Sequence, residues 1–153
     1  MRHHLVPRAA ALLVVAAVAC SSITGVERDV FDGILYERRP SVLGYTESPP
    51  AGVTAPDTVT AGVPFTVTVP TYGGGCIRLG DTDVRVAGAV VEVRPYEWFV
   101  SAGQAIACTA DIRRLDHTAT VTLGTPGRAT LRVIGRQMPE GAAISIERTL
   151  VVR

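Results

Sequence analysis

Val63-Pro64-Phe65-Thr66-Val67-Thr68-Val69 is the stretch that decides the fold of this 153-residue chain. Apolar and polar residues alternate along it, and successive side chains of a β-strand point to opposite faces of a sheet. A period of two built from β-branched residues predicts a half-buried strand and excludes a helix. Thr66 and Thr68 should face away from the core, and Pro70 should end the strand because it has no N–H to donate. The residues expected on the buried face are Val63, Phe65, Val67 and Val69.

Similar short runs recur along the rest of the chain. They occupy residues 33–37, 84–86, 89–93, 105–112, 119–123, 129–134 and 144–152. Turn-rich stretches separate them, among them 73–75, 80–81, 87–88, 102–103, 124–127 and 139–141. Short strands with Gly/Pro turns about ten residues apart are typical of an antiparallel β-sandwich. We therefore predict an all-β fold over 31–153, an antiparallel immunoglobulin-like β-sandwich of about seven to eight strands, with a small β-barrel as the alternative.

One residue interrupts the pattern of the last run. Ile144, Ile146, Leu150 and Val152 share one parity, and Arg148 falls on the same parity. A buried face rarely holds an unpaired charge. Arg148 therefore either breaks that face or marks a bulge.

Two segments resemble a known kind of envelope module. Residues 56–76 are similar to the opening of bacterial immunoglobulin-like modules, which have a proline-led strand, an Ala-Gly turn and an alternating second strand. Residues 127–133, Gly-Arg-Ala-Thr-Leu-Arg-Val, resemble the penultimate strand of such modules. The resemblance implies an architecture and leaves the function open, because this fold hosts unrelated activities.

The N-terminus is typical of an export signal. Arg2 and Arg8 precede an apolar stretch over 9–19, and small residues precede Cys20. A membrane-spanning helix needs about 20 apolar residues, and this stretch has eleven. We predict a signal peptide at 1–19.

Cys20 gives that signal a more specific meaning. A cysteine directly after small residues resembles the lipobox, in which a lipid is attached to the thiol and the chain is cleaved before it. Ala17 departs from the pattern, because lipoboxes most often carry Leu there. A serine directly after the lipidated cysteine, as Ser21 is here, resembles the signal that sorts lipoproteins to the outer membrane. We predict lipidation of Cys20, a flexible tether at 20–30, and a lipid-anchored location in the cell envelope, at the outer membrane; a plain cleaved signal is the alternative. With this signal, the chain resembles small bacterial lipoproteins that carry one immunoglobulin-like domain.

The cysteine count agrees with export. With Cys20 lipidated, Cys76 and Cys108 remain as an even pair in an oxidising compartment, where disulfides persist. Their bond would close a loop of about 30 residues and contribute roughly 3–4 kcal/mol in the chain-entropy model. A metal site is the alternative, but His117 is the single mature histidine and gives no recognisable ligand spacing. Because Cys76 follows its strand, we expect the bond to staple a loop.

Charge argues against a nucleic-acid partner. All fifteen basic residues are arginine, and loss of Arg2 and Arg8 leaves thirteen against fourteen acidic residues, a net charge of −1. Nucleic-acid binding usually needs a clustered basic face. We expect no nucleic-acid partner.

No residue set indicates catalysis or a metal. His117 lies beside Asp116, with Asp111 nearby, but a hydrolase also needs a nucleophile and an oxyanion hole. Asp81 and Asp83 supply too few oxygen ligands for calcium. None of the candidate serine nucleophiles lies in a Gly-x-Ser-x-Gly motif. These serines are Ser21, Ser22, Ser41, Ser48, Ser101 and Ser145. We expect no catalytic residue, metal or cofactor.

The aromatic residues Tyr72, Tyr96 and Trp98 are the best candidates for a binding surface. Aromatic platforms bind sugars and peptides, although a Trp in a sandwich often packs in the core beside a disulfide. We predict a non-catalytic binding or structural role, with the membrane as partner through Cys20 and an envelope protein, glycan or peptidoglycan as the second partner. The alternative is a small secreted or periplasmic hydrolase or metal-dependent enzyme.

Overall fold

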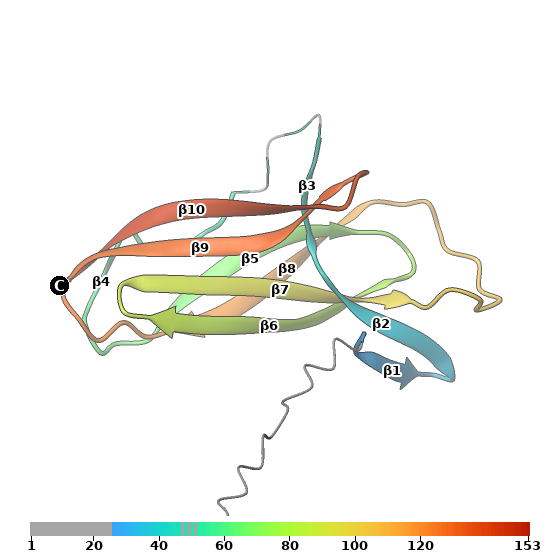
Figure 1. The fold of residues 1–153 in the computed structure, drawn as a ribbon, viewed down its shortest axis with the longest axis horizontal. Coiled ribbons are helices and arrows are strands. Elements are labelled where there is room, and N and C mark those ends of the chain that lie inside the picture. The colour runs from blue at the N-terminus through green and yellow to red at the C-terminus, as the bar shows by residue number, and fades with distance from the viewer. Residues whose placement is uncertain (1–25, 47, 49, 51) are drawn as a thin grey trace, which may run out of the picture.

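The computed structural model describes residues 26–46, 48, 50 and 52–153. The predicted signal peptide, the lipidated Cys20 and most of the predicted tether lie outside these residues. The described chain is all-β, with ten strands and no helix (Figure 1). The strands are β1 (Arg28–Phe31), β2 (Ile34–Pro40), β3 (Val42–Tyr45), β4 (Thr58–Val59), β5 (Phe65–Gly73), β6 (Ile77–Ala87), β7 (Val90–Val100), β8 (Arg113–Val121), β9 (Gly127–Met138) and β10 (Ala142–Val152).

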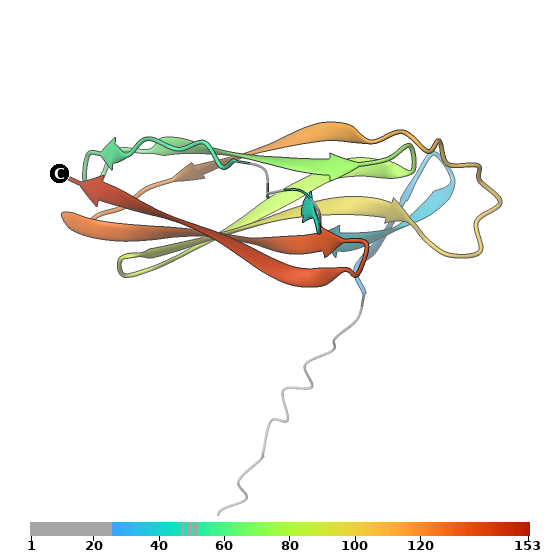
Figure 2. The ribbon, with the colours of Figure 1, turned by 90° about the horizontal axis from the view of Figure 1, so that it is seen from above.

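The strands form two layers joined by a crossover. Figure 2 shows β5 and β8 in one layer, and β6, β7, β9 and β10 in the other. β2 pairs with β7, and β3, which follows after Ser41, pairs with both β9 and β5. The β2–β3 segment therefore links the layers, and the hydrogen-bonded path runs β1-β2-β7-β9-β3-β5-β8.

The prediction of a purely antiparallel sheet was wrong. β7 and β3 both run parallel to β9, and β4 runs parallel to β10. Alternation of side chains specifies the faces of a strand but carries no information on the direction of its neighbour. The tether was also predicted too long, because residues 28–30 belong to β1 and pair with β2.

The core between the layers is aliphatic. Val67 and Val69 are 0% and 1% exposed, Phe65 packs against the same cluster, and Thr66 is exposed, as the alternation predicted. Val63 is 51% exposed, contrary to the prediction, because it precedes β5 in a turn closed by a bond from its N–H to the Thr60 carbonyl. The other buried members of the core are Leu43, Val53, Val59, Val91, Val93, Ala119, Val121, Leu123, Ala129, Leu131, Val133, Leu150 and Val152.

Pro70 lies inside β5, which continues to Gly73. Thr68 exchanges two backbone hydrogen bonds with Thr54, at 2.8 and 2.9 Å. The nitrogen of Pro70, two residues further on, points to that same edge. Its missing N–H therefore leaves the ladder with β8 intact.

Arg148 neither marks a β-bulge nor breaks the inward face of β10. The β9–β10 register is unbroken from Ala142 to Val152. The Arg148 guanidinium donates to the Val53 carbonyl at 2.6 Å and to Asp57 at 2.7 Å. Arg148 therefore occupies the margin of the buried face, where an arginine can pack its methylenes and keep its charge paired.

Two turn and strand predictions need correction. Gly80 and Asp81, predicted as a turn, lie inside β6 at a register shift between Leu79 and Thr82. A Cβ at Gly80 would lie 2.4 Å from the Tyr96 carbonyl oxygen, so only glycine fits. Residues 105–112, predicted as a strand, are instead part of the exposed loop that joins β7 to β8.

Candidate binding surface

The aromatic residues gather in one half of the molecule. Seven of the eight lie on β1, β2 or β3, or on residues paired with those strands; Phe65 alone packs against the aliphatic core. The seven are Phe31, Tyr36, Tyr45, Tyr72, Tyr96, Trp98 and Phe99. This half is therefore built from a different class of side chain than the core between the layers.

The outer face of β7 presents two of the predicted site residues. Val91, Val93 and Glu97 point into the molecule, so Tyr96 and Trp98 fall on the opposite face. Trp98 pairs with Arg38 of β2 on one side and with Arg78 of β6 on the other. With Phe31 and Tyr36, these residues make up what we call the aromatic–arginine face: Phe31, Tyr36, Arg38, Arg78, Tyr96 and Trp98.

The rings and guanidinium groups of this face contact one another. Phe31 packs edge-on against Tyr36 and Trp98, with ring centroids 5.4 and 5.5 Å apart. The Arg38 guanidinium lies 3.4 Å from the centre of the Tyr96 ring, and the Arg78 guanidinium lies 5.1 Å from that of Tyr36. Edge-to-face rings and arginines over aromatic faces are both favourable arrangements. The residues of the face are therefore held in place by contacts with one another.

The charges of the face are paired. Arg38 donates to both carboxylate oxygens of Asp81, at 2.9 and 2.7 Å, and to Asp83 at 3.2 Å. The hydrogen bond with Arg38 lowers the pKa of Asp81, and Asp81 raises the pKa of Arg38. Arg78 donates to Asp32 at 2.7 Å. The guanidinium groups are therefore neutralised, and the face offers rings and hydrogen-bonding groups without an excess of positive charge.

The predicted disulfide is confirmed. Cys76 and Cys108 are bonded, with Cα atoms 5.1 Å apart, inside the usual range of about 4.4–6.8 Å. Cys76 lies between β5 and β6, and Cys108 lies in the exposed 101–112 loop, so the bond staples a loop as expected. Cys76 also packs with Tyr36, Val100 and Trp98, which places the tryptophan beside the disulfide.

Tyr72 is not part of the aromatic–arginine face. It lies on β5, opposite Val42 of β3, and its ring centroid is 6.0 Å from that of Tyr45. The three predicted surface residues therefore do not form one site. Tyr45 itself lines a shallow hollow with Thr46, Ser48, Met138, Pro139 and Glu140.

A serine and a histidine meet inside the molecule. Ser41 Oγ lies 3.3 Å from His117 Nε2, and Thr82 Oγ1 lies 3.2 Å from His117 Nδ1. Ser41 and His117 are 0% and 2% exposed, so a substrate has no access to this hydroxyl. Burial lowers the pKa of His117 to about 4, although Asp81 and Asp116 favour its charged form. The imidazole is therefore neutral near pH 7 and links the β2–β3 crossover to β8.

Asp111 lies elsewhere, exposed in the loop before β8. It accepts a hydrogen bond from the Thr109 hydroxyl and forms an ion pair with Arg113, with a nitrogen–oxygen distance of 3.0 Å. The His117–Asp111–serine set that a hydrolase would need is therefore not assembled. No three His, Cys, Asp or Glu side chains among residues 26–46, 48, 50 and 52–153 are grouped to hold a metal.

Glu97 was missed by the sequence analysis. Its side chain is fully buried, pairs with Arg136, and leaves Oε2 without a partner in the described structure. Burial raises the pKa of Glu97, against the lowering effect of Arg136. Arg136 also donates to the Pro40 carbonyl at 2.8 Å, so the pair fastens β7 and β9 to the β2–β3 crossover. Its parity with Val91 and Val93 was the signal that could have placed Glu97 inward.

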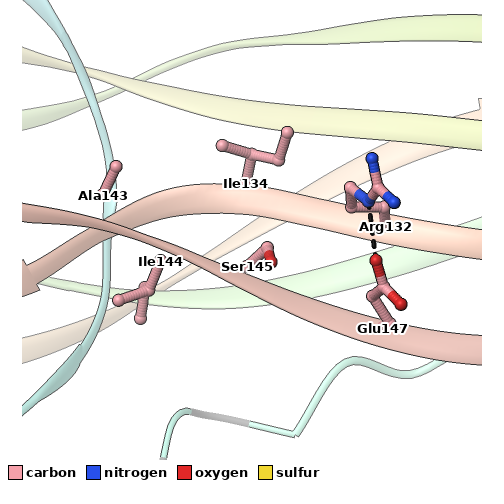
Figure 3. Close-up of a pocket in the computed structure, with 6 residues that line it drawn as sticks. All are labelled: Arg132, Ile134, Ala143, Ile144, Ser145 and Glu147. Atoms are coloured by element: carbon pink, nitrogen blue, oxygen red, sulfur yellow. Dashed lines mark hydrogen bonds and ion pairs between the residues drawn. The ribbon is translucent and has the colours of Figure 1, made fainter.

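A shallow groove lies along β9 and β10 (Figure 3). It is lined by Arg132, Ile134, Ala143, Ile144, Ser145 and Glu147, and its main polar contact is the Arg132–Glu147 ion pair at 2.7 Å. Arg132 is the one basic side chain among these six lining residues, and it is paired with Glu147, not with Ser145. The groove therefore lacks the groups that would activate this serine.

Comparison of the chain with protein-family models, curated proteins and solved structures gave no match. No helix in the part of the chain that the structure describes is long and apolar enough to cross a membrane.

Proposed function

We propose that this chain is a lipid-anchored cell-envelope protein whose β domain acts by binding and not by catalysis. The signal-like N-terminus ending at Cys20 supports the anchor. The Cys76–Cys108 disulfide supports an oxidising compartment, because disulfides persist mainly outside the cytosol. A lipid on Cys20 would hold the domain at the membrane, with two or more acyl chains needed for stable attachment.

The observation that carries the binding role is the aromatic–arginine face. Trp98 is partly exposed on an outer sheet face, between Arg38 and Arg78. An indole ring with hydrogen-bonding groups on both sides suits a partner that has an apolar face and a polar rim, as a sugar ring does. The envelope glycan, peptidoglycan included, is therefore the proposed partner, with an envelope protein as the second choice.

We also propose that the two-layered domain is an immunoglobulin-like sandwich of altered strand order. The β9–β10 hairpin faces the β5–β8 pair, and β4 runs beside β10, as an edge strand does in such domains. The departure is β7, which lies between β6 and β9 and runs parallel to β9. An experimental structure that joined β9 to an antiparallel neighbour on both sides would contradict the altered order.

The anchor is tested by the mass of the mature protein. We expect cleavage before Cys20, addition of acyl chains to that cysteine, and partition into detergent. Cys20→Ser should give a soluble protein or an uncleaved precursor. Cleavage at another position with an unmodified Cys20 would overturn the anchor.

The binding role is tested by sedimentation with purified peptidoglycan. The Cys20→Ser protein should sediment with the glycan, and Trp98→Ala should weaken binding about tenfold, since a base or ring stacked on an aromatic side chain contributes roughly 1–3 kcal/mol. Tyr72→Ala is the matched control, because it removes a partly buried ring away from this face. Equal losses in both variants would remove the face from the site.

A hydrolase is the second candidate: Ser41 and His117 are within hydrogen-bond reach, but both are buried, so catalysis would require the site to open. A fluorophosphonate probe, which labels activated serines, decides between the two. We expect no labelling of the folded protein, and labelling that Ser41→Ala abolishes would establish the enzyme.

A further inference from the structure

The position of β1 limits how far the domain can lie from the membrane; this inference rests on the proposed anchor at Cys20. Six Cα–Cα steps join Cys20 to Val26, and covalent geometry limits such a segment to roughly 20–22 Å in any conformation. Val26 therefore lies within about 20 Å of the bilayer surface.

The strand register shows which end of the domain this restraint brings to the bilayer. The Glu27 carbonyl accepts a hydrogen bond from the Arg38 N–H at 2.8 Å, and Arg38 is paired with Trp98. Val26 is therefore level with about Glu97 along β7. At about 3.3 Å per residue, Val100 lies roughly 10 Å away in one direction and Val90 roughly 23 Å away in the other. The Val100 end comes within reach of the bilayer when the sheet stands upright, and the Val90 end is at the limit of reach.

The 101–112 loop projects from the Val100 end, at the opposite end of the molecule from the C-terminus (Figure 1). Residues 101–110 carry no charge. Residues 102–112 are exposed throughout, with Ile106 at 36% and Ile112 at 64%. The loop is held in place by the Cys76–Cys108 bond and by the Gly75 N–H, which donates to the Thr109 carbonyl at 3.4 Å.

We propose that the 101–112 loop rests on the lipid surface and is the second membrane contact of the anchored protein. Ile106, in the uncharged part of the loop, enters the boundary between headgroups and acyl chains, where exposed apolar side chains are buried. Because the loop is uncharged up to Asp111, a zwitterionic lipid is sufficient. The contact orients the domain upright and turns its Val90 end away from the membrane.

The test uses the lipidated protein in vesicles of phosphatidylcholine whose acyl chains are brominated near the headgroup. In a Trp98→Phe background, which removes the native tryptophan, Ile106→Trp should lose roughly half of its fluorescence, because residues at that boundary lie about 5–10 Å deep. Val63→Trp is the matched control, because Val63 is 51% exposed near the opposite end. We expect its emission to be unchanged.

Hydrogen exchange of the unsubstituted protein provides a second measurement that does not depend on the tryptophan variants. Amides of residues 102–107 should exchange more slowly on vesicles than in the soluble Cys20→Ser protein, and those of residues 60–64 should not change. Equal quenching at both positions, quenching at neither, or no slowing of 102–107 would overturn the loop contact and leave the anchor standing. Failure of the wild-type protein to associate with the vesicles would overturn both.

Discussion

The aliphatic core and the aromatic–arginine face hold the same sheet together in different ways. Between the layers, Val, Leu and Ala side chains pack without charge, and Leu131, Val91 and Val67 are 0% exposed. On the outer face of β2 and β7, rings are covered by arginines that are themselves paired with acids. Burial of apolar area stabilises the first region. The second region is held by ring contacts, ion pairs and the Cys76–Cys108 bond; it buries Tyr36 and leaves Tyr96 and Trp98 partly exposed.

Truncation of a large side chain in the aliphatic core measures how much the burial of apolar area contributes to stability. Leu131→Ala should lower the free energy of unfolding by about 3–5 kcal/mol, because it removes a fully buried side chain and leaves a cavity. The same substitution at Leu79, which is 51% exposed, should cost no more than about 0.5 kcal/mol. Urea melts of the Cys20→Ser domain measure both values. A similar cost at the two positions would show that the core is elsewhere.

Removal of the disulfide measures how much the covalent bond contributes to the stability of the region around the aromatic–arginine face. The double variant Cys76→Ser, Cys108→Ser should lose roughly 3–4 kcal/mol, because the unfolded chain regains the freedom of a loop of 32 residues. A reductant should lower the melting temperature of the parent protein and leave the double variant unchanged. Faster hydrogen exchange should be concentrated in residues 101–112, and faster exchange in β9 instead would place the bond in the aliphatic region.

The buried histidine lies where the two regions meet, and it makes the domain sensitive to acid. Burial lowers the pKa of His117 to about 4, so the unfolded chain binds its proton first, near the usual value of about 6.5. Stability should therefore fall by up to about 3 kcal/mol as the pH drops from about 6.5 to about 4, with no further loss from this group below that. His117 is the only histidine after residue 4, so in a protein that lacks residues 1–19 one imidazole signal in the NMR spectrum reports its titration.

Glu97 has the opposite effect on the pH dependence of stability. Burial raises its pKa, so the folded state binds the proton more tightly than the unfolded chain, and this group adds stability as the pH falls. His117→Gln separates the two contributions: its stability should be less dependent on pH between about 4 and 6.5 than that of the parent. An imidazole that titrates near its ordinary pKa would show that His117 is not buried in solution.

The smallest effects test the two faces of β5. Val67→Ala should cost roughly 1–3 kcal/mol, since Val67 is 0% exposed. Thr66→Ala on the exposed face should change stability by no more than about 0.5 kcal/mol. Thermal melts of the two variants suffice. If Thr66 proved the costlier residue, the face assigned to this strand would be inverted.

The alternation of side chains correctly predicted strands that have one buried face. It did not predict features that depend on contacts between segments far apart in the sequence. Phe65, Val67 and Val69 share a face as expected, because parity is a local property of a strand. The parallel pairs of β9 with β3 and β7 join segments far apart in the sequence, and alternation does not encode them. Pro70 and Gly80 were interpreted as a strand end and a turn, but tertiary contacts keep both inside strands.

The candidate site was predicted only in part for the same reason. Trp98 and the cysteine pair were identified from residue type and count. The arginines over the rings, the buried Glu97 and the Ser41–His117 contact depend on which strands become neighbours. Tyr72 was grouped with Trp98 because both are aromatic, whereas strand pairing places them on different parts of the sheet.

The late position of β9 in the chain has a consequence for the order of folding. β9 begins at Gly127, yet it pairs with β3, β7 and β10. Contacts between distant segments make folding slow, because a long loop must close before they form. Strands made earlier can form the β6–β7 hairpin, but β3 and β7 lack their common neighbour until β9 exists. The two layers can therefore close over their core only after nearly the whole chain has been synthesised.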